Sequence, residues 1–267
     1  MAKRQVESLA NWLRGPGSHI LTFPDHIDYG VTITPPMSRR GLSFGGESED
    51  VLAGRPGGFY VLTPLEDCLT PEERASRLRS YSPYWTQVTS YHEWVGHGLH
   101  LPNLPKLVAM ADKRPIRVMV GNGIGFGQTW AFYLEKLMED EGYFKTLPYM
   151  EELKTRMARL QMRMWRIQRI LTKLKMAKGE MNFEEAVDAY VKKSGMEPTN
   201  AYIEVQRDSE PCSPPGSEII GERELLKLKE EYKRRMGEYY TLKKFHDNLL
   251  SHGLLNFKQI RRLMFRD

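Results

Sequence analysis

The chain has 267 residues, 40% of them hydrophobic and 27% charged, which is the composition of an ordinary globular protein with a substantial core. The formal net charge is only +5, and acidic residues are interleaved with the basic ones, which favours solvated helix faces over a nucleic-acid-binding surface. The two cysteines have no CxxC spacing, and no apolar run is long enough for a signal peptide or a membrane span, so we expect a cytoplasmic protein without membrane or nucleic-acid partners.

The predicted elements begin with a short helix over residues 5–14 and two strands over residues 28–34 and 58–63. The segment between the strands, residues 38–57, is rich in Gly, Ser and Arg and is predicted to be an irregular loop. The two strands are expected to pair across this loop in a small sheet. This irregular, sheet-containing part covers residues 1–66.

Residues 67–267 have a helical pattern, and we expect both parts to form a single mainly α domain with a small sheet near the amino end. The run Thr70-Pro71-Glu72-Glu73 is typical of a helix start, with a capping hydroxyl, a proline and acids in the first turn. Further helices are expected over residues 82–99, 128–141, 148–176, 182–194, 199–207, 221–237, 242–251 and 256–265.

The longest of these helices, over residues 148–176, carries a Met-rich apolar stripe at helical spacing, which we predict to lie in the core. The stripe comprises Leu153, Met157, Leu160, Met164, Ile167, Ile170, Leu171 and Leu174.

The candidate site is the run from Tyr91 to His100, where His92, Glu93 and His97 offer the side chains of a divalent-metal site. Zinc prefers imidazole nitrogen and carboxylate oxygen, and in the HExxH pattern the glutamate acts as general base. Here the pattern is HExxxH, and five residues on a regular helix span roughly 500°, so the two rings would point about 140° apart. We therefore predict a one-residue π-bulge at Val95-Gly96, which restores a common face; His100 is peripheral. The alternative is a helix that carries histidines by chance.

At these residues the sequence resembles two groups of metallopeptidases. The His-Glu-x-x-Gly-His spacing is similar to that of the dipeptidyl peptidase III family, a zinc-binding family. A wider resemblance is to a bacterial family of unknown function related to the gluzincin metallopeptidases, with a signature close to His-Glu-Ala-x-Pro-Gly-His-His. The landmarks shared with its carboxy-terminal half are residues 56–60, 91–93, 96–97, 130–135, 204–207, 245–247 and Gly253.

The resemblance also implies a third metal ligand, at a position where this chain departs from the pattern. The family's next helix opens Glu-Gly-Trp-Ala-Leu-Tyr, and here Gln128 stands in place of that glutamate. The family's later Tyr-x-x-Gly motif, whose phenol would stabilise an oxyanion, is replaced here by a run that opens with Glu218. Either Gln128 or Glu218 is therefore expected to complete the set begun by His92 and His97. The family's amino-terminal half has no counterpart, so a compact relative, a subunit completed by a partner chain and a fragment all stay open.

Two later residues and a glycine run are further candidates. The forked guanidinium of Arg207 suits a substrate carboxylate, but it suits a structural bridge to Glu204 equally well. His246 is either a core residue or, as the resemblance implies, a donor to the substrate. The glycines at 121, 123, 125 and 127 miss the GxGxxG spacing and lie in no βαβ series, which favours a loop beside the metal site over a dinucleotide site.

These patterns predict a zinc-dependent hydrolase of metallopeptidase ancestry, with Fe, Mn and Co as other metals that the same donors bind. Glu93 would take a proton from the attacking water, and the substrate would be an amide or peptide bond in a peptide or a small molecule. Two alternatives stay open: a metal-dependent lyase, isomerase or redox enzyme acting on a small metabolite, and a non-catalytic helical binding protein. A homo-oligomer is also consistent with the sequence.

Overall fold

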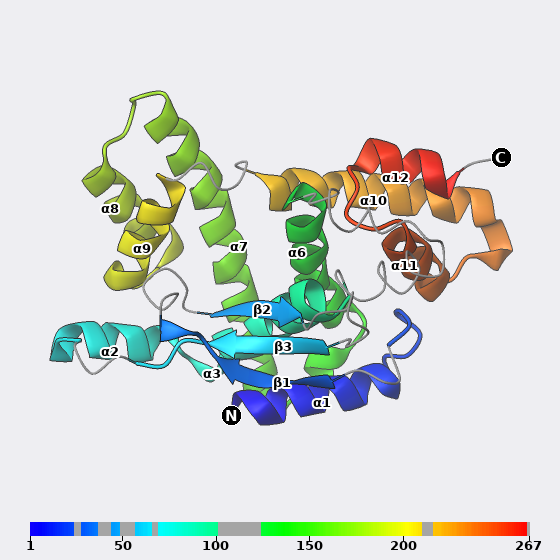
Figure 1. Cartoon of the computed structure of the whole chain (residues 1–267), viewed down its shortest axis with the longest axis horizontal. Coiled ribbons are helices and arrows are strands. Elements are labelled where there is room, and N and C mark those ends of the chain that lie inside the picture. The colour runs from blue at the N-terminus through cyan, green and yellow to red at the C-terminus, as the bar shows by residue number, and fades with distance from the viewer. Residues whose placement is uncertain are drawn as a thin grey trace.

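The computed structural model describes residues 1–23, 28–36, 44–48, 57–65, 69–100, 124–209 and 216–265. Within these ranges the chain is mainly helical with a small sheet near the amino end, as the sequence predicts (Figure 1). One cluster of buried apolar side chains extends from the first helix to the last.

The sheet has the strand order β1-β3-β2, with β1 at Asp28–Ile33, β2 at Phe44–Ser48 and β3 at Gly57–Leu62. β3 pairs in parallel with β1 and antiparallel with β2. The prediction of an irregular loop over residues 38–57 is therefore wrong at β2. The strand is held by main-chain pairing to β3, and such pairing depends on the neighbouring strand more than on the residues' own propensity.

Helices cover the sheet and lead into the candidate site. α1 (Ala2–Arg14) packs against β1. α2 (Pro71–Ser80) begins at the predicted point, where Thr70 and Glu73 form a reciprocal capping box. α3 (Pro83–Thr89), capped by the Ser82 hydroxyl, continues directly into the π-helix η2 (Ser90–His100), and β2 and β3 both pack against η2.

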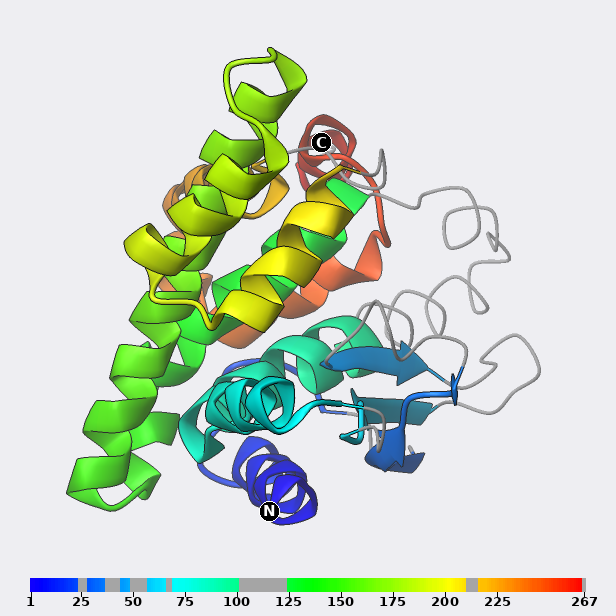
Figure 2. The same cartoon turned by 90° about the vertical axis from the view of Figure 1, so that its left-hand side faces the viewer.

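The centre of the molecule is formed by α6 (Ile124–Asp140), which packs against η2 on one side and α10 (Ser217–Met236) on the other. The turn η3 (Tyr143–Thr146) then leads to the longest helix, α7 (Tyr149–Ala177). α8 (Phe183–Ser194) folds back along α7, and α9 (Pro198–Asp208) packs on both (Figure 2). The turn η4 (Gly237–Tyr239), α11 (Leu242–Ser251) and α12 (Phe257–Met264) complete the chain.

The apolar stripe of α7 is exposed, so the prediction that it lies in the core is wrong. Met157 is 69% exposed, and Leu160, Met164 and Leu174 are each about half exposed. The face of α7 that is buried instead consists largely of polar and charged side chains, which make ion pairs and hydrogen bonds inside the protein. Its members are Thr155, Ala158, Arg159, Met162, Trp165, Arg166, Gln168 and Thr172.

The apolar run at residues 116–120 and the glycines at 121 and 123 lie outside the described residues. Gly125 and Gly127 lie in α6, which begins at Ile124, so the prediction of a loop is wrong at these two glycines. Among the helices of the described ranges, none combines the length and apolar composition that crossing a bilayer requires.

Candidate metal centre

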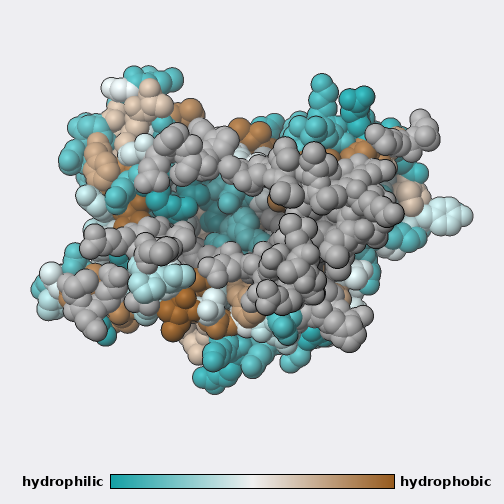
Figure 3. Space-filling model, viewed as in Figure 1, coloured by the Kyte–Doolittle hydropathy of each residue, from teal (hydrophilic) through white to brown (hydrophobic). Residues whose placement is uncertain are grey.

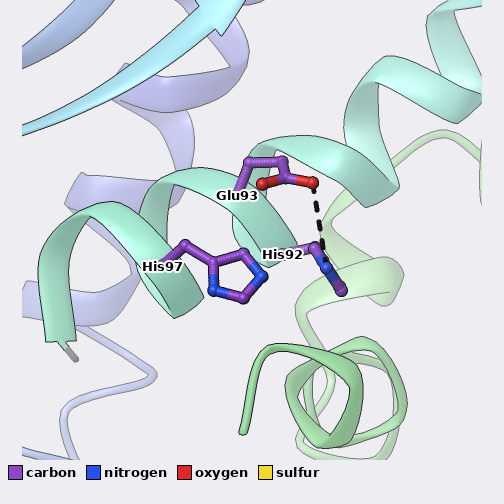
Figure 4. Close-up of side chains that lie close together, drawn as sticks. All are labelled: His92, Glu93 and His97. Atoms are coloured by element: carbon purple, nitrogen blue, oxygen red, sulfur yellow. Dashed lines mark ion pairs between the residues drawn. The ribbon is translucent and has the colours of Figure 1, made fainter. Parts of the chain in front are cut away.

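The π-helix η2 brings His92 and His97 together. In a π-helix the hydrogen bond joins residues five apart, so the five-residue spacing that separates the rings on an α-helix places them on one face. The π geometry extends over the whole of Ser90–His100, further than the predicted one-residue bulge. The two ring centroids are 5.1 Å apart, and Glu93 Oε1 lies 3.8 Å from His92 Nε2 (Figure 4).

Gly96 sets how closely η2 approaches α6. A Cβ at this position would lie 2.7 Å from Ala131 Cβ and 2.8 Å from Ala131 Cα, closer than carbon atoms pack. Glycine is therefore required for close packing against α6, in addition to the local flexibility that the sequence suggested. This close approach brings a carboxylate of α6, Glu135, up to the first histidine.

His92 is buried against Glu135 and Arg166. Its Nδ1 lies 2.8 Å from Glu135 Oε1, and Arg166 Nη2 lies 2.8 Å from the same oxygen. All three side chains are at most 4% exposed. Neither Glu135 oxygen has a hydrogen bond of good geometry, so these contacts are electrostatic. Arg166 Nη2 lies 3.4 Å from the same Nδ1, and a guanidinium can only donate. The tautomer whose Nε2 lone pair faces Glu93 and His97 therefore requires Glu135, rather than Arg166, to be the hydrogen-bond partner of Nδ1. Glu135 is not among the site residues predicted from the sequence, although it lies seven residues after Gln128 and therefore on the same face of α6.

Burial determines the protonation of the site. It lowers the pKa of His97 to about 3 and lowers the pKa of His92 well below its usual value, and the Arg166 guanidinium lowers both further. Both imidazoles are therefore neutral at physiological pH, which is the form that binds metals. Burial also raises the pKa of Glu93 to about 7, although Arg166 and Arg207 oppose this rise. Glu93 thus has the pKa that suits a general base near neutral pH.

A second ion network, formed by Arg169 with Glu204 and Glu218, lies beside the histidines. Arg169 donates from Nη1 to Glu218 Oε1 at 2.7 Å and from Nη2 to Glu204 Oε2 at 2.8 Å. Although burial alone would raise them, Arg169 holds the pKa values of both carboxyls below their usual range. Both carboxyls are therefore ionised at neutral pH, and Glu218 contributes negative charge to the surroundings of His92 and His97.

The structure places the two candidates for a third ligand differently. Glu218 is buried and paired with Arg169. The ligand atoms of His92, Glu93 and His97 all lie within 4.8 Å of one another, and Glu218 does not belong to this group. Gln128 is half-buried on α6, one turn before Ala131 and on the same face. Because Ala131 packs on Gly96, this register directs Gln128 towards the η2 side of α6.

Arg207 lies at the edge of the site. Its Nη1 donates to Glu204 Oε1 at 2.9 Å, so the structural bridge weighed for it is present, yet its side chain remains 43% exposed. The positive charge of Arg207 also acts on the pKa of Glu93. In the view of Figure 3, the middle of the molecule is hollowed between α7 and α6, and the visible floor of this hollow is hydrophilic.

His246 is enclosed in the core on α11. Its Nδ1 lies 2.8 Å from the Ile20 carbonyl and its Nε2 lies 3.1 Å from the Tyr133 hydroxyl, and the ring is fully buried. Trp130 and Phe245 pack on the ring, so the contacts of His246 join α11 to α6 and to the segment after α1. Of the resembling residues 245–247, Phe245 and His246 are buried and Asp247 is half-buried.

The fold and the site together define a mainly helical protein with a His-Glu-His cluster on a π-helix, backed by a buried carboxylate. The chain belongs to the family described as "Bacterial protein of unknown function (DUF885)", whose model matches residues 3–264. No curated protein matches the chain.

Two solved structures share the fold. One is described as "the putative lipoprotein from Colwellia psychrerythraea"; it has 19% identity and a TM-score of 0.74, with 98% of this chain and 42% of that chain covered. The other is "a putative lipoprotein of unknown function from Shewanella oneidensis". It has 22% identity and a TM-score of 0.73, with 99% of this chain and 45% of that chain covered. The present chain therefore spans less than half the length of these two proteins.

Proposed function

We propose that the protein binds a divalent cation, most simply zinc, through His92 and His97 and hydrolyses an amide or peptide bond. The observation that carries the proposal is the clustering of His92, Glu93 and His97, whose ligand atoms all lie within 4.8 Å of one another. The donors fit zinc, because both imidazoles are held neutral and one is backed by a carboxylate, the usual partner of a zinc-binding histidine. Fe, Mn and Co are other metals that the same donors bind.

A bound zinc ion supplies Lewis acidity and lowers the pKa of water at the site. The residues of the chain supply the remaining roles. Glu93, with its pKa near 7, accepts a proton from the attacking water and returns it to the leaving amine. Glu135 orients His92, and Arg166 keeps Glu135 in place.

Gln128 is our choice for the third protein donor. Glu218 would have to leave Arg169, from which it accepts a 2.7 Å hydrogen bond. Gln128 precedes Ala131, which packs on Gly96, by one helical turn. An amide oxygen leaves the site one charge more positive than a glutamate would, and a more positive site favours an anionic substrate group.

Arg207 is proposed to bind a carboxylate of the substrate. Its planar fork matches a carboxylate, it is partly exposed at the edge of the site, and its charge reaches Glu93. A peptide or small amide with a free carboxylate near the scissile bond is the substrate class that fits.

Metal content and hydrolysis test the proposal together. We expect about one equivalent of metal in the purified protein, lost in His92→Ala and retained in His19→Ala, which removes an exposed imidazole paired with Glu141. Glu93→Gln should retain the metal and lose hydrolysis of a peptide panel. A substoichiometric metal content that His92→Ala leaves unchanged overturns the proposal. Stoichiometric metal with no hydrolysis by the wild type favours a metal-dependent enzyme of another class.

The location of the protein is a separate proposal. The sequence predicts the cytoplasm, whereas the lipoprotein description of the two similar structures favours a location at a membrane or outside the cell. Fractionation of the source cells followed by immunoblotting distinguishes the two.

A further inference from the structure

The exposed stripe of α7 has the spacing of a coiled-coil seam. Starting at Met150, its large apolar residues follow one another at alternating intervals of three and four, which is the a/d pattern of a heptad repeat. The pattern continues through four heptads without a polar residue at any a or d position, and the exposed fractions range from 37% to 69%. The seam comprises Met150, Leu153, Met157, Leu160, Met164, Ile167, Leu171 and Leu174.

Rotation of α7 within the protein cannot bury the seam. The opposite face is fixed by buried ion pairs, in which Arg159 contacts Glu139 and Arg166 contacts Glu135. Turning the helix would break these pairs and leave charges buried without partners, which is strongly unfavourable. The seam therefore remains available to a surface outside the chain as described.

The two arginines that flank the seam have carboxylate partners. Arg156 is paired with Glu152 on α7 itself, and Arg163 is paired with Glu222 of α10 at 2.8 Å. Because each of these arginines already has a carboxylate partner, two seams brought face to face experience little repulsion from them. Lys154 and Lys175 also flank the seam, and Lys154 Nζ donates to the Tyr84 hydroxyl at 3.3 Å.

The area of the seam is sufficient for a stable dimer. α7 has 29 residues, so it is about 44 Å long. Eight large side chains that are roughly half exposed offer on the order of 700 Å² per copy, close to the ~800 Å² that each partner contributes to an interface of standard size. A contiguous apolar surface of this extent marks an interaction site.

We propose that the seam is the interface at which a second copy of this chain docks, as a two-helix contact with two-fold symmetry. A two-fold interface uses the same patch on both copies, and a regular heptad stripe is complementary to itself. This inference goes beyond the proposed function and does not depend on it. It gives α7 two roles, because the face opposite the seam carries the arginines that surround the metal site.

Analytical ultracentrifugation of the full chain tests the proposal. We expect a dimer of about 62 kDa, twice the chain's 31.0 kDa. The double variant Leu160→Glu/Met164→Glu places charges at the middle of the seam and should raise the dimer dissociation constant on the order of 100-fold. The control is Leu78→Glu on α2, which alters a side chain of similar exposure, 55%, away from the seam and should leave the dimer intact. Circular dichroism confirms that each variant is folded.

A monomeric wild type at micromolar concentrations overturns the proposal, and so does a dimer that survives the double variant. If the wild type is monomeric but a different polypeptide binds the seam, self-pairing is likewise refuted. Metal content and hydrolysis are measured on the same samples, so a failure of the proposed function is distinguished from a failure of the dimer.

Discussion

The contact between Glu135 and His92 is the feature of the site that a single substitution tests most directly. Burial raises the pKa of Glu135 to about 7, although Arg166 and Arg159 oppose this rise. Glu135→Gln therefore keeps the size of the side chain and removes a charge that is fully present only above neutral pH. The matched control is Glu139→Gln, one turn further along α6, where Glu139 contacts Arg159 at 2.5 Å and Arg156 at 3.5 Å. Both substitutions remove a carboxylate that is paired with a buried arginine of α7, although Glu139 is 13% exposed and Glu135 only 2%. Only Glu135 touches a proposed metal ligand.

The structure gives the magnitudes. Arg166 and Arg159 are 4% and 8% exposed, so each variant leaves a buried guanidinium facing an amide in place of a carboxylate. Removing one partner of a buried ion pair costs about 3–5 kcal/mol, and because the amide oxygen still accepts a hydrogen bond, we expect about 2–3 kcal/mol in both variants. The metal affinity should differ between them: Glu135→Gln weakens it by about 10–100-fold, and Glu139→Gln leaves it within about twofold.

Two measurements separate these effects. Denaturant unfolding in the presence of a chelator gives the stability of the metal-free protein, and competition with a chromophoric zinc chelator gives the metal affinity. The reasoning is refuted if Glu135→Gln weakens metal binding no more than Glu139→Gln does, because Glu135 would then stabilise the fold without orienting His92.

Three further predictions concern packing, pH and the substrate. Gly96→Ala should lower the unfolding free energy by about 1–3 kcal/mol, because the added Cβ meets Ala131. The control is Gly125→Ala, whose Cβ would meet nothing within 4 Å and which should raise the unfolding free energy by about 0.5–1 kcal/mol. Equal denaturant midpoints for the two variants would contradict the close approach of η2 and α6. Although burial opposes it, Arg169 holds the pKa of Glu204 below 4.5, so the contribution of Glu204 is present above pH ~4.5 and is lost as the pH falls through the folded-state pKa. Near neutral pH, Glu204→Gln should lower the unfolding free energy by about 2–3 kcal/mol, because it leaves Arg169 with only Glu218 as a carboxylate partner. In acid the loss should be much smaller, because Glu204 is then protonated in the wild type. A stability difference between wild type and variant that does not depend on pH would count against this pair. Arg207→Ala should raise KM about tenfold for substrates with a free carboxylate and leave the KM of the matching amides unchanged. Because Arg207 lowers the pKa of Glu93, kcat near neutral pH should fall to the same extent for both substrates. The same rise in KM for both would exclude carboxylate binding by Arg207.

Local signals in the sequence fixed several helix ends. Thr70 with Glu73, Asn182 with Glu185, and Asn256 with Gln259 all form the reciprocal caps typical of helix starts, because such caps depend only on residues within one turn. The helix over residues 242–251 has the predicted bounds. Strand β2 was missed, because its place in the sheet comes from pairing to β3.

The stripe of α7 shows where periodicity misleads. Its spacing correctly predicted a long helix, but an apolar face was assumed to face the core. The structure buries the polar face, because Arg159 and Arg166 have carboxylate partners on α6 and Arg169 has them on α9 and α10. Thr172 also contacts a carboxylate of α9, that of Asp208, at 3.5 Å. Partners that come from distant segments are invisible in a local pattern.

The sequence by itself determined the chemistry of the candidate site, since His92, Glu93 and His97 lie within six residues and a helical distortion is enough to align them. Only the tertiary structure decided how this chemistry is supported. Gly96 allows η2 to pack closely against Ala131 of α6, and the carboxylate behind His92 comes from α6 and contacts an arginine of α7. Burial by these elements makes the imidazoles neutral and brings the pKa of Glu93 to about 7. Desolvation is a property of the packed protein, and no spacing along the chain specifies it.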